Sequence, residues 1–191
     1  MRRFKAKRPD GGGRTGTGPS TGTDRATTDD KTTEIAAVRL LARREHSTRD
    51  LKRKLTGKGH DSESVERVVG KLSDKKLLSD ERFAATFVLH HGRRGQGPVR
   101  IRAELRQQGA SDDVIDAALA RAELDWADIA SQARVRKFGA GAPGSLPERA
   151  KQARFLQYRG FSADQIRAAL SGSAAPAADD ELGLAGPDGF D

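Results

Sequence analysis

In three stretches of the chain, apolar residues at helical spacing are followed by a glycine. The residues are Leu51, Leu55 and Gly59; Ile101, Leu105 and Gly109; and Leu156 and Gly160. Such spacing predicts one buried stripe on a helix, and a glycine just past the helix end can adopt the left-handed conformation that closes it. The glycines lie 50 and 51 residues apart, which predicts one structural unit in three copies. Gln152 breaks the stripe in the third copy, where Phe155 and Leu156 are expected to supply the packing instead.

Each glycine is followed by the pattern of a second, capped helix. Asp61, Ser111 and Ser162 offer side-chain oxygens to the free N–H groups at a helix start. The apolar residues six, nine and ten places after the glycines would form the buried face of this helix: Val65, Val68 and Val69; Ile115, Ala118 and Leu119; Ile166, Ala169 and Leu170. These residues are interpreted as packing and capping positions only.

A further helix precedes each pair and completes a three-helix unit. Its apolar positions are Ile35, Val38, Leu41 and Ala42; Phe83, Ala84, Phe87 and Val88; and Trp126, Ile129, Ala130 and Ala133. Ser47 to Asp50 resembles a capping box opening the middle helix of the first unit. Alternating β-branched positions are absent, so no sheet is expected. The sequence predicts an all-α fold, an elongated array of three tandem three-helix repeats at residues 33–78, 79–123 and 124–170.

The two ends of the chain differ from its middle in composition and charge. Residues 1–32 are rich in Gly and Thr and hold almost nothing apolar, and residues 171–191 are rich in Ala, Gly, Pro and acid. Both segments are expected to be disordered, because they cannot bury enough apolar surface. The net charge is +3 over residues 1–30, +10 over residues 31–170 and −5 over the rest. A basic helical part favours a polyanion or an acidic protein groove as partner.

Basic residues occupy matching places before the three glycines. Lys52 and Arg102 stand seven places before, Arg53 and Arg154 six, Arg100 and Lys151 nine, and Lys58 and Arg159 one. We interpret these residues, with Arg93 and Arg94, as candidate contacts to a protein partner or to DNA. At 100° per residue they flank the apolar stripe on several sides, so a merely solvated helix surface is the alternative interpretation.

Two longer loops are expected between the first and second helices of the later repeats, at residues 90–97 and 139–146. In the first, Arg93 and Arg94 lie on a glycine-rich frame before Pro98. Two arginines beside free N–H groups of a helix start could bind a phosphate or a carboxylate. A plain connector is the alternative.

The sequence offers no catalytic or cofactor site. His46, His60, His90 and His91 lack the spacing of metal ligands, and we interpret them as exposed residues at helix ends. The glycine-rich segment 92–98 lacks the Lys-Ser/Thr ending of a phosphate loop. Because the chain also lacks cysteine and long apolar runs, we expect a non-enzymatic cytoplasmic protein without metal, cofactor or membrane contact.

Four ordered blocks of the sequence resemble the bacterial RecX regulators. They are Arg44 to Ser47 with Leu51 and Leu55; Leu77 to Ala84; Gly95 to Pro98 with Ile101, Glu104, Leu105 and Gly109; and Phe155 to Ser162 with Ile166. The resemblance covers about residues 34–170. It implies three tandem three-helix repeats in a monomer that modulates the RecA recombinase, usually by inhibition, from the groove of its filament on single-stranded DNA. Such a protein would affect strand exchange, DNA repair and the SOS response, and the resemblance implies no catalytic residue.

Two other functions stay open at the level of sequence. Paired short helices at a glycine turn and a sequence pI near 10.1 also fit a free-standing DNA-binding protein. None of the middle helices carries the cluster of Asn, Gln and Arg that reads base edges. A passive helical scaffold for another protein is the second alternative.

Overall fold

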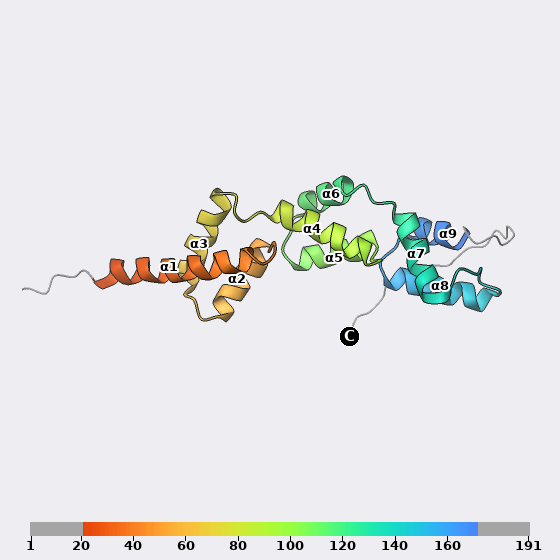
Figure 1. Cartoon of the computed structure of the whole chain (residues 1–191), viewed down its shortest axis with the longest axis horizontal. Helices are drawn as coiled ribbons and strands as arrows, with labels where there is room; N and C mark the ends of the chain where they lie inside the picture. Colours follow the sequence, from red (N-terminus) through yellow and green to blue (C-terminus); the bar gives the residue numbers. More distant parts are fainter. Residues whose placement is uncertain (1–20, 172–191) are drawn as a thin grey trace, which may run out of the picture.

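The computed structural model describes residues 21–171, which form nine α-helices and no strand (Figure 1). Residues 1–20 and 172–191, and with them most of the predicted basic arm and acidic tail, lie outside the described residues. The helices are α1 (Thr21–Leu41), α2 (Thr48–Gly57), α3 (Ser62–Asp74), α4 (Asp80–Arg93), α5 (Pro98–Gln107), α6 (Asp112–Arg121), α7 (Trp126–Phe138), α8 (Leu146–Tyr158) and α9 (Ala163–Ser171).

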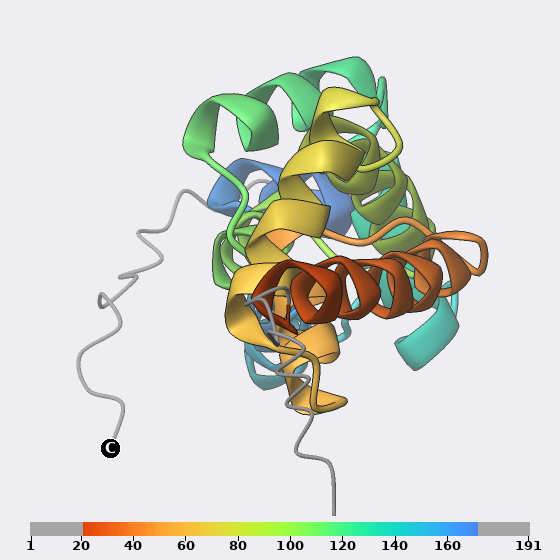
Figure 2. The same ribbon diagram turned by 90° about the vertical axis from the view of Figure 1, so that its left-hand side faces the viewer.

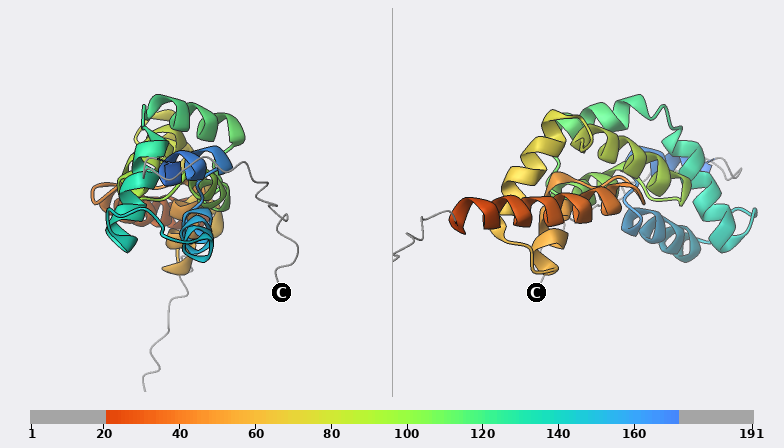
Figure 3. Two further views of the ribbon diagram at one scale, coloured as in Figure 1. Left: turned by 90° about the vertical axis from the view of Figure 1, so that its right-hand side faces the viewer. Right: turned by 60° about the vertical axis from the view of Figure 1, so that its left-hand side comes forward.

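The helices form three consecutive groups along the long axis of the molecule (Figure 1). In each group the first and third helices pack together, α1 with α3, α4 with α6 and α7 with α9, and the middle helix packs against them. Each group has its own cluster of buried apolar side chains. The predicted all-α array of three-helix repeats is therefore confirmed. The turned views show α1 and the α7–α9 group at opposite ends of the array (Figures 2 and 3).

The predicted helix ends are confirmed with one exception. Gly59, Gly109 and Gly160 have positive φ values of 89°, 89° and 85°, the conformation that favours glycine. Asp61 accepts a hydrogen bond from the backbone N–H of Ser64 at 3.0 Å, and Ser162 accepts one from Gln165 at 3.3 Å. Ser111 precedes α6 but makes no such side-chain bond.

The helix α1 begins earlier than predicted. It starts at Thr21, so residues 21–32 of the predicted disordered arm are helical. Contacts to α3 explain why a segment poor in apolar residues is ordered here. Asp30 pairs with Arg67 at 2.9 Å and lies 3.5 Å from Lys71, and the Arg67 hydrogen bond lowers the Asp30 pKa to about 2. Thr33, which is buried, hydrogen-bonds the His60 Nδ1 atom at 2.9 Å.

The first long loop is shorter than predicted, because α4 continues to Arg93. His90, His91 and Arg93 are therefore helical, and only residues 94–97 connect α4 to α5. Stacking supports the added turn: the His91 ring lies on the Phe87 ring with centroids 3.8 Å apart. The second loop, between Phe138 and Leu146, has the predicted position.

The third repeat keeps a polar residue in its core. Gln152 is buried although it is not apolar, and its Oε1 atom lies 3.4 Å from the Nη1 atom of Arg134, which is also buried. The same Arg134 nitrogen donates to the carbonyl of Gly141 at 3.0 Å. Leu156 is fully buried and Phe155 packs against the cluster, as expected from the sequence.

Candidate functional site

Four of the ten predicted binding residues are engaged in ion pairs within their own repeat. Lys52 pairs with Glu66 at 2.5 Å, and Arg102 pairs with Asp116. Both pairs join residues 14 positions apart and tie the middle helix to the third helix. Arg53 pairs with Asp50 at 2.5 Å, and Arg100 pairs with Glu104 at 2.7 Å. The shared place of Lys52 and Arg102 before their glycines therefore reflects a repeated structural contact.

Four of the ten remain exposed without an ion-pair partner among the described residues. They are Lys58, Arg93, Lys151 and Arg154. Arg94 is exposed as well, and its only side-chain contact in the described part of the chain is a 3.4 Å approach to the Nε2 atom of His90. Together these five residues place at least one free positive charge on every repeat.

Arg159, and with it the ion-paired Arg100 that packs against Gly160, lies at the joint between the second and third repeats. The Gly97 N–H donates to the Arg159 carbonyl at 2.8 Å, and the Val99 N–H donates to the Gly160 carbonyl at 3.0 Å. The Arg159 guanidinium donates to the carbonyls of Arg94 and Gly95, each at 3.1 Å. The start of α5 is thus bonded to the turn that ends α8, and Arg159 acts there as a structural residue.

Apolar contacts reinforce this second joint. Trp126, at the start of α7, packs against the buried clusters of both the second and the third repeat. Leu124 and Trp126 also cover Gly92 at the end of α4, where a Cβ atom would lie 2.6 Å from Leu124. The helices α4 and α7 are in direct contact. The second and third repeats therefore share one continuous apolar region.

The first joint uses the same ends of the repeats but different groups. The Ser47 hydroxyl, at the start of α2, donates to the Gln108 carbonyl at the end of α5 at 2.8 Å. Gly109 packs against Arg49, where a Cβ atom would lie 3.0 Å from the Arg49 Cβ. The Thr48 N–H donates to Asp80 at 2.8 Å. The glycines after α5 and α8 thus each end a helix, and each also packs against the middle helix of the preceding repeat.

A buried charge cluster lies beside the first joint. Asp50 is buried and accepts from His46 at 2.8 Å, Lys54 at 2.8 Å and Arg53 at 2.5 Å. Burial opposes ionisation of Asp50, but hydrogen bonds from Lys54 and His46 and the charges of Lys54 and Arg53 outweigh it and lower the pKa to about 2. His46 is only 2% exposed, so the predicted exposed position of this histidine is wrong. Its partner Asp50, one turn along α2, explains the burial.

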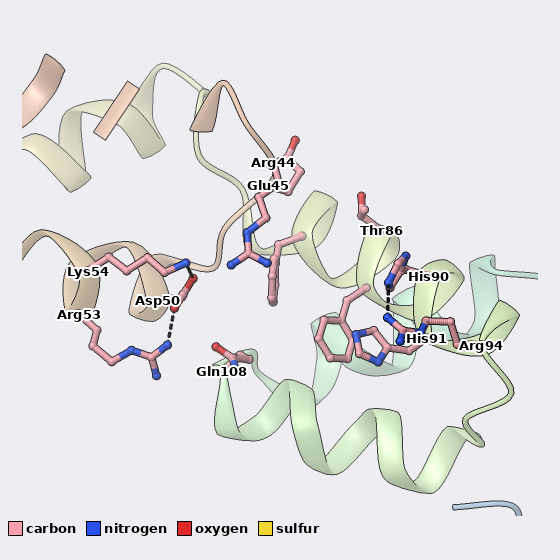
Figure 4. A pocket seen from close by; sticks show the side chains of 12 residues that line it. Arg44, Glu45, Asp50, Arg53, Lys54, Thr86, His90, His91, Arg94 and Gln108 are labelled. Atoms are coloured by element: carbon pink, nitrogen blue, oxygen red, sulfur yellow. Dashed lines mark hydrogen bonds and ion pairs between the residues drawn. The ribbon is translucent and has the colours of Figure 1, made fainter. Parts of the chain in front are cut away.

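A cavity of about 620 Å³ opens between the first and second repeats (Figure 4). One wall is formed by α2 and the segment before it, and the other by α4. The lining residues are Arg44, Glu45, Asp50, Arg53, Lys54, Phe83, Thr86, Phe87, His90, His91, Arg94 and Gln108. The cavity combines aromatic rings with positively charged side chains, and two of the ten predicted residues, Arg53 and Arg94, contribute to it.

Comparison with known proteins identifies the family. Models of the first, second and third three-helix domains of RecX match residues 36–72, 79–119 and 123–170. The regulatory protein RecX of Halorhodospira halophila is 53% identical over 148 residues, which cover 78% of this chain and 90% of that protein. The chain belongs to the RecX family.

Further RecX proteins support the assignment. The Regulatory protein RecX of Pseudomonas fluorescens strain Pf-5 is 44% identical over 136 residues, covering 71% of this chain and 88% of the relative. Two RecX crystal structures match the fold with TM-scores of 0.66 and 0.65 at 23% and 19% identity. The first match covers 76% of this chain and 73% of its own, and the second, from Lactobacillus salivarius, covers 76% and 97%.

The RecX domains coincide with the structural repeats. The domain models meet at residues 72–79 and 119–123, where the chain leaves α3 for α4 and α6 for α7. Among the described residues, no helix is both long and apolar enough to cross a bilayer, and no three His, Asp or Glu side chains are grouped to hold a metal ion.

Sequence reasoning missed Arg44 and Lys54 as cavity residues. Lys54 has no basic residue at the matching place of another repeat, whereas Arg44 and Arg94 each stand fifteen places before their glycine, a match that was overlooked. The signals that could have found them are this match and the concentration of basic residues just before and within α2, next to a repeat boundary.

Proposed function

We propose that this RecX protein modulates the RecA recombinase, with inhibition as the expected direction. The mechanism would be binding in the groove of the RecA filament on single-stranded DNA, where the protein would hinder ATP turnover and strand exchange and so restrain the DNA-damage response. The observation that carries the proposal is family membership over all three repeats, because the related proteins are named regulatory proteins.

The shape and charge of the array support this proposal. Repeats joined end to end form an extended body that can contact successive subunits of a helical filament. Free positive charges lie on every repeat, from Lys58 in the first, through Arg93 in the second, to Lys151 and Arg154 in the third. A groove lined by acidic protein surface and DNA phosphate complements such a distribution.

The test measures DNA-dependent ATP hydrolysis and strand exchange by RecA at increasing concentrations of the protein. We expect the combined variant Lys58→Glu, Arg93→Glu, Lys151→Glu and Arg154→Glu to need about tenfold more protein for the same inhibition. The matched control, Arg39→Glu, Lys76→Glu, Arg121→Glu and Lys137→Glu, changes the net charge equally at exposed positions. Unchanged RecA activity at an excess of the wild-type protein would contradict the proposal.

Free-standing DNA binding is the second candidate, and the net charge of +10 over residues 31–170 favours it. Affinity for DNA measured without recombinase at two salt concentrations separates the two. Tight, sequence-selective binding would favour this candidate, whereas weak binding that falls steeply with salt would favour a filament regulator using phosphate contacts.

A further inference from the structure

The cavity between the first two repeats has aromatic side chains on one side and, at its rim, arginines without a described carboxylate partner. From this juxtaposition we propose that the cavity binds one nucleotide unit of single-stranded nucleic acid, with the base against Phe83 and Phe87 and the phosphate at Arg44 and Arg94. The inference deepens the proposed contact with DNA, because it rests on that contact and names the cavity, the residues and the kind of strand that would make it.

The aromatic wall supplies the surface for a base. Phe83 and Phe87 are half-buried side chains of α4, and their ring centroids lie 5.7 Å apart. His91 stacks on Phe87 with ring planes inclined by only 15°, so that a row of flat rings lines one side of the cavity. Proteins bind the bases of single strands by stacking them on such rings, whatever the base.

The charged rim supplies the site for phosphate. Both acidic residues of the cavity are already neutralised: Asp50 by Arg53, Lys54 and His46, and Glu45 by Arg82 at 3.0 Å. Arg44 and Arg94 come from different repeats and have no carboxylate partner in residues 21–171. A guanidinium binds phosphate oxygens well, so a phosphate that entered the cavity could contact both.

The size of the cavity suits one nucleotide unit. A volume of about 620 Å³ lies within the range of small-molecule sites, roughly 300–1,000 Å³. Duplex DNA hides the faces of its bases, whereas an unpaired strand exposes them. An acidic peptide would satisfy the arginines but would leave the rings without a planar partner, so the combination favours a single strand.

The first experiment measures the fluorescence anisotropy of a labelled oligothymidylate of about twelve nucleotides, with the full chain and no recombinase. An abasic strand of the same length carries the phosphates without the bases. We expect the oligothymidylate to bind at least about tenfold more tightly than the abasic strand. Equal affinities for the oligothymidylate and the abasic strand would overturn the proposal. It would also be overturned if thymidine monophosphate bound as tightly as the oligothymidylate, or if an acidic peptide at equal concentration displaced the oligothymidylate.

The second experiment assigns the binding to the cavity. Arg44→Glu should weaken binding of the oligothymidylate by about tenfold or more, while Arg43→Glu, its exposed neighbour outside the cavity, should change it less than about twofold. Phe83→Leu should abolish the preference for the oligothymidylate over the abasic strand. If Phe83→Leu fails to fold, Thr86→Glu, at an exposed position of the lining, is the second variant and should abolish the same preference.

Equal losses from Arg43→Glu and Arg44→Glu would show binding by general charge and overturn the assignment, as would a preference for bases that survives in Thr86→Glu. Because no recombinase is present, these results are independent of the inhibition assay. A variant that loses strand binding but still inhibits RecA would leave the proposed function intact.

Discussion

The two joints of the array use the same parts of the repeat and hold them in different ways. In each, the start of a middle helix meets the glycine turn that ends the middle helix of the next repeat. At the second joint, two backbone hydrogen bonds and a shared tryptophan make the contact. At the first joint, the corresponding contact is a single hydrogen bond from a serine hydroxyl to a backbone carbonyl. The first and second repeats also have separate apolar clusters.

The difference shows how one repeated unit can provide both rigidity and a site. At the second joint, backbone hydrogen bonds and the half-buried Trp126 join the two repeats directly. Polar side chains at the first joint hold the repeats together around an open cavity of about 620 Å³. The cavity therefore occurs at the joint where the apolar connection is missing.

The largest effect is expected at Gly160, when alanine is substituted at each of the three turn glycines in turn. All three share the same strained φ, so Gly59→Ala, with nothing within 4 Å, measures the backbone strain alone, about 1–2 kcal/mol. Gly109→Ala adds a tight contact with the Arg49 side chain, whose Cβ and Cδ atoms would each lie 3.0 Å away. Gly160→Ala adds an overlap with the Arg100 backbone, whose nitrogen would lie 2.5 Å away, and should destabilise the protein by about 4 kcal/mol.

Urea unfolding of the three variants checks this order, and Gly70→Ala is the control. Gly70 lies within α3 with open space around it, so alanine there should stabilise the protein by about 0.5–1 kcal/mol. If Gly59→Ala were as destabilising as Gly160→Ala, the turn glycines would serve helix ends only, and the joints would not depend on them.

The next effect concerns the shared tryptophan. Trp126→Ala should destabilise the protein by about 3 kcal/mol and uncouple the second and third repeats, because the apolar link between their clusters is lost. Since Trp126 is the only tryptophan of the chain, its fluorescence in the wild type reports on the second joint. Unfolding followed by fluorescence and by circular dichroism should coincide in the wild type. In Trp126→Phe, which keeps a ring, most of the stability should return.

Sequence alone predicted the repeats because their signals are local. The pattern that predicted them follows from the period of a helix and from the backbone conformation at its end. Both are set by neighbouring residues, as at Gly59, Gly109 and Gly160 and the apolar positions around them. The start of α1 was missed because its order depends on Asp30 reaching Arg67 of α3, 37 residues away. A composition rich in Thr and Asp contains no trace of that contact.

The candidate site was harder to predict, because a basic residue in the sequence does not show whether its side chain contacts a carboxylate, a carbonyl or solvent in the fold. Lys52 and Arg159 match basic residues in other repeats, yet one pairs with Glu66 and the other binds carbonyls across the second joint. Arg44 and Arg94 also match, each fifteen places before its glycine, and these two line the cavity. Only the arrangement of the repeats separates structural cations from free ones.

An intermediate effect is expected at Asp50, which stabilises the start of α2, beside the first joint, in a pH-dependent way. Its pKa is about 2 in the folded protein against 3.8 in the unfolded chain. The unfolded chain therefore takes up a proton first as the pH falls, and stability present above pH 4 is lost between about pH 4 and 2. The loss amounts to about 2 kcal/mol.

Chemical unfolding between pH 6 and 2 measures this contribution. Asp50→Asn should be less stable than the wild type at pH 6 and should show a shallower decline in acid. Asp113→Asn, an exposed carboxylate without an ion pair among the described residues, is the control and should keep the wild-type slope. An unchanged slope in Asp50→Asn would mean that the buried cluster does not stabilise the folded state.

The smallest effect separates the helix cap at Ser47 from the joint that it makes. Ser47 accepts from the Asp50 N–H at 3.0 Å and donates to the Gln108 carbonyl. Ser145 makes the same kind of cap at 3.4 Å on α8, and its hydroxyl has no other described bond. Each alanine variant should lose about 1 kcal/mol from the cap, and Ser47→Ala about 1 kcal/mol more from the joint. Equal losses in urea unfolding would mean that the serine bond contributes nothing, and that Thr48 with Asp80 and Arg82 with Glu45 hold the first two repeats together.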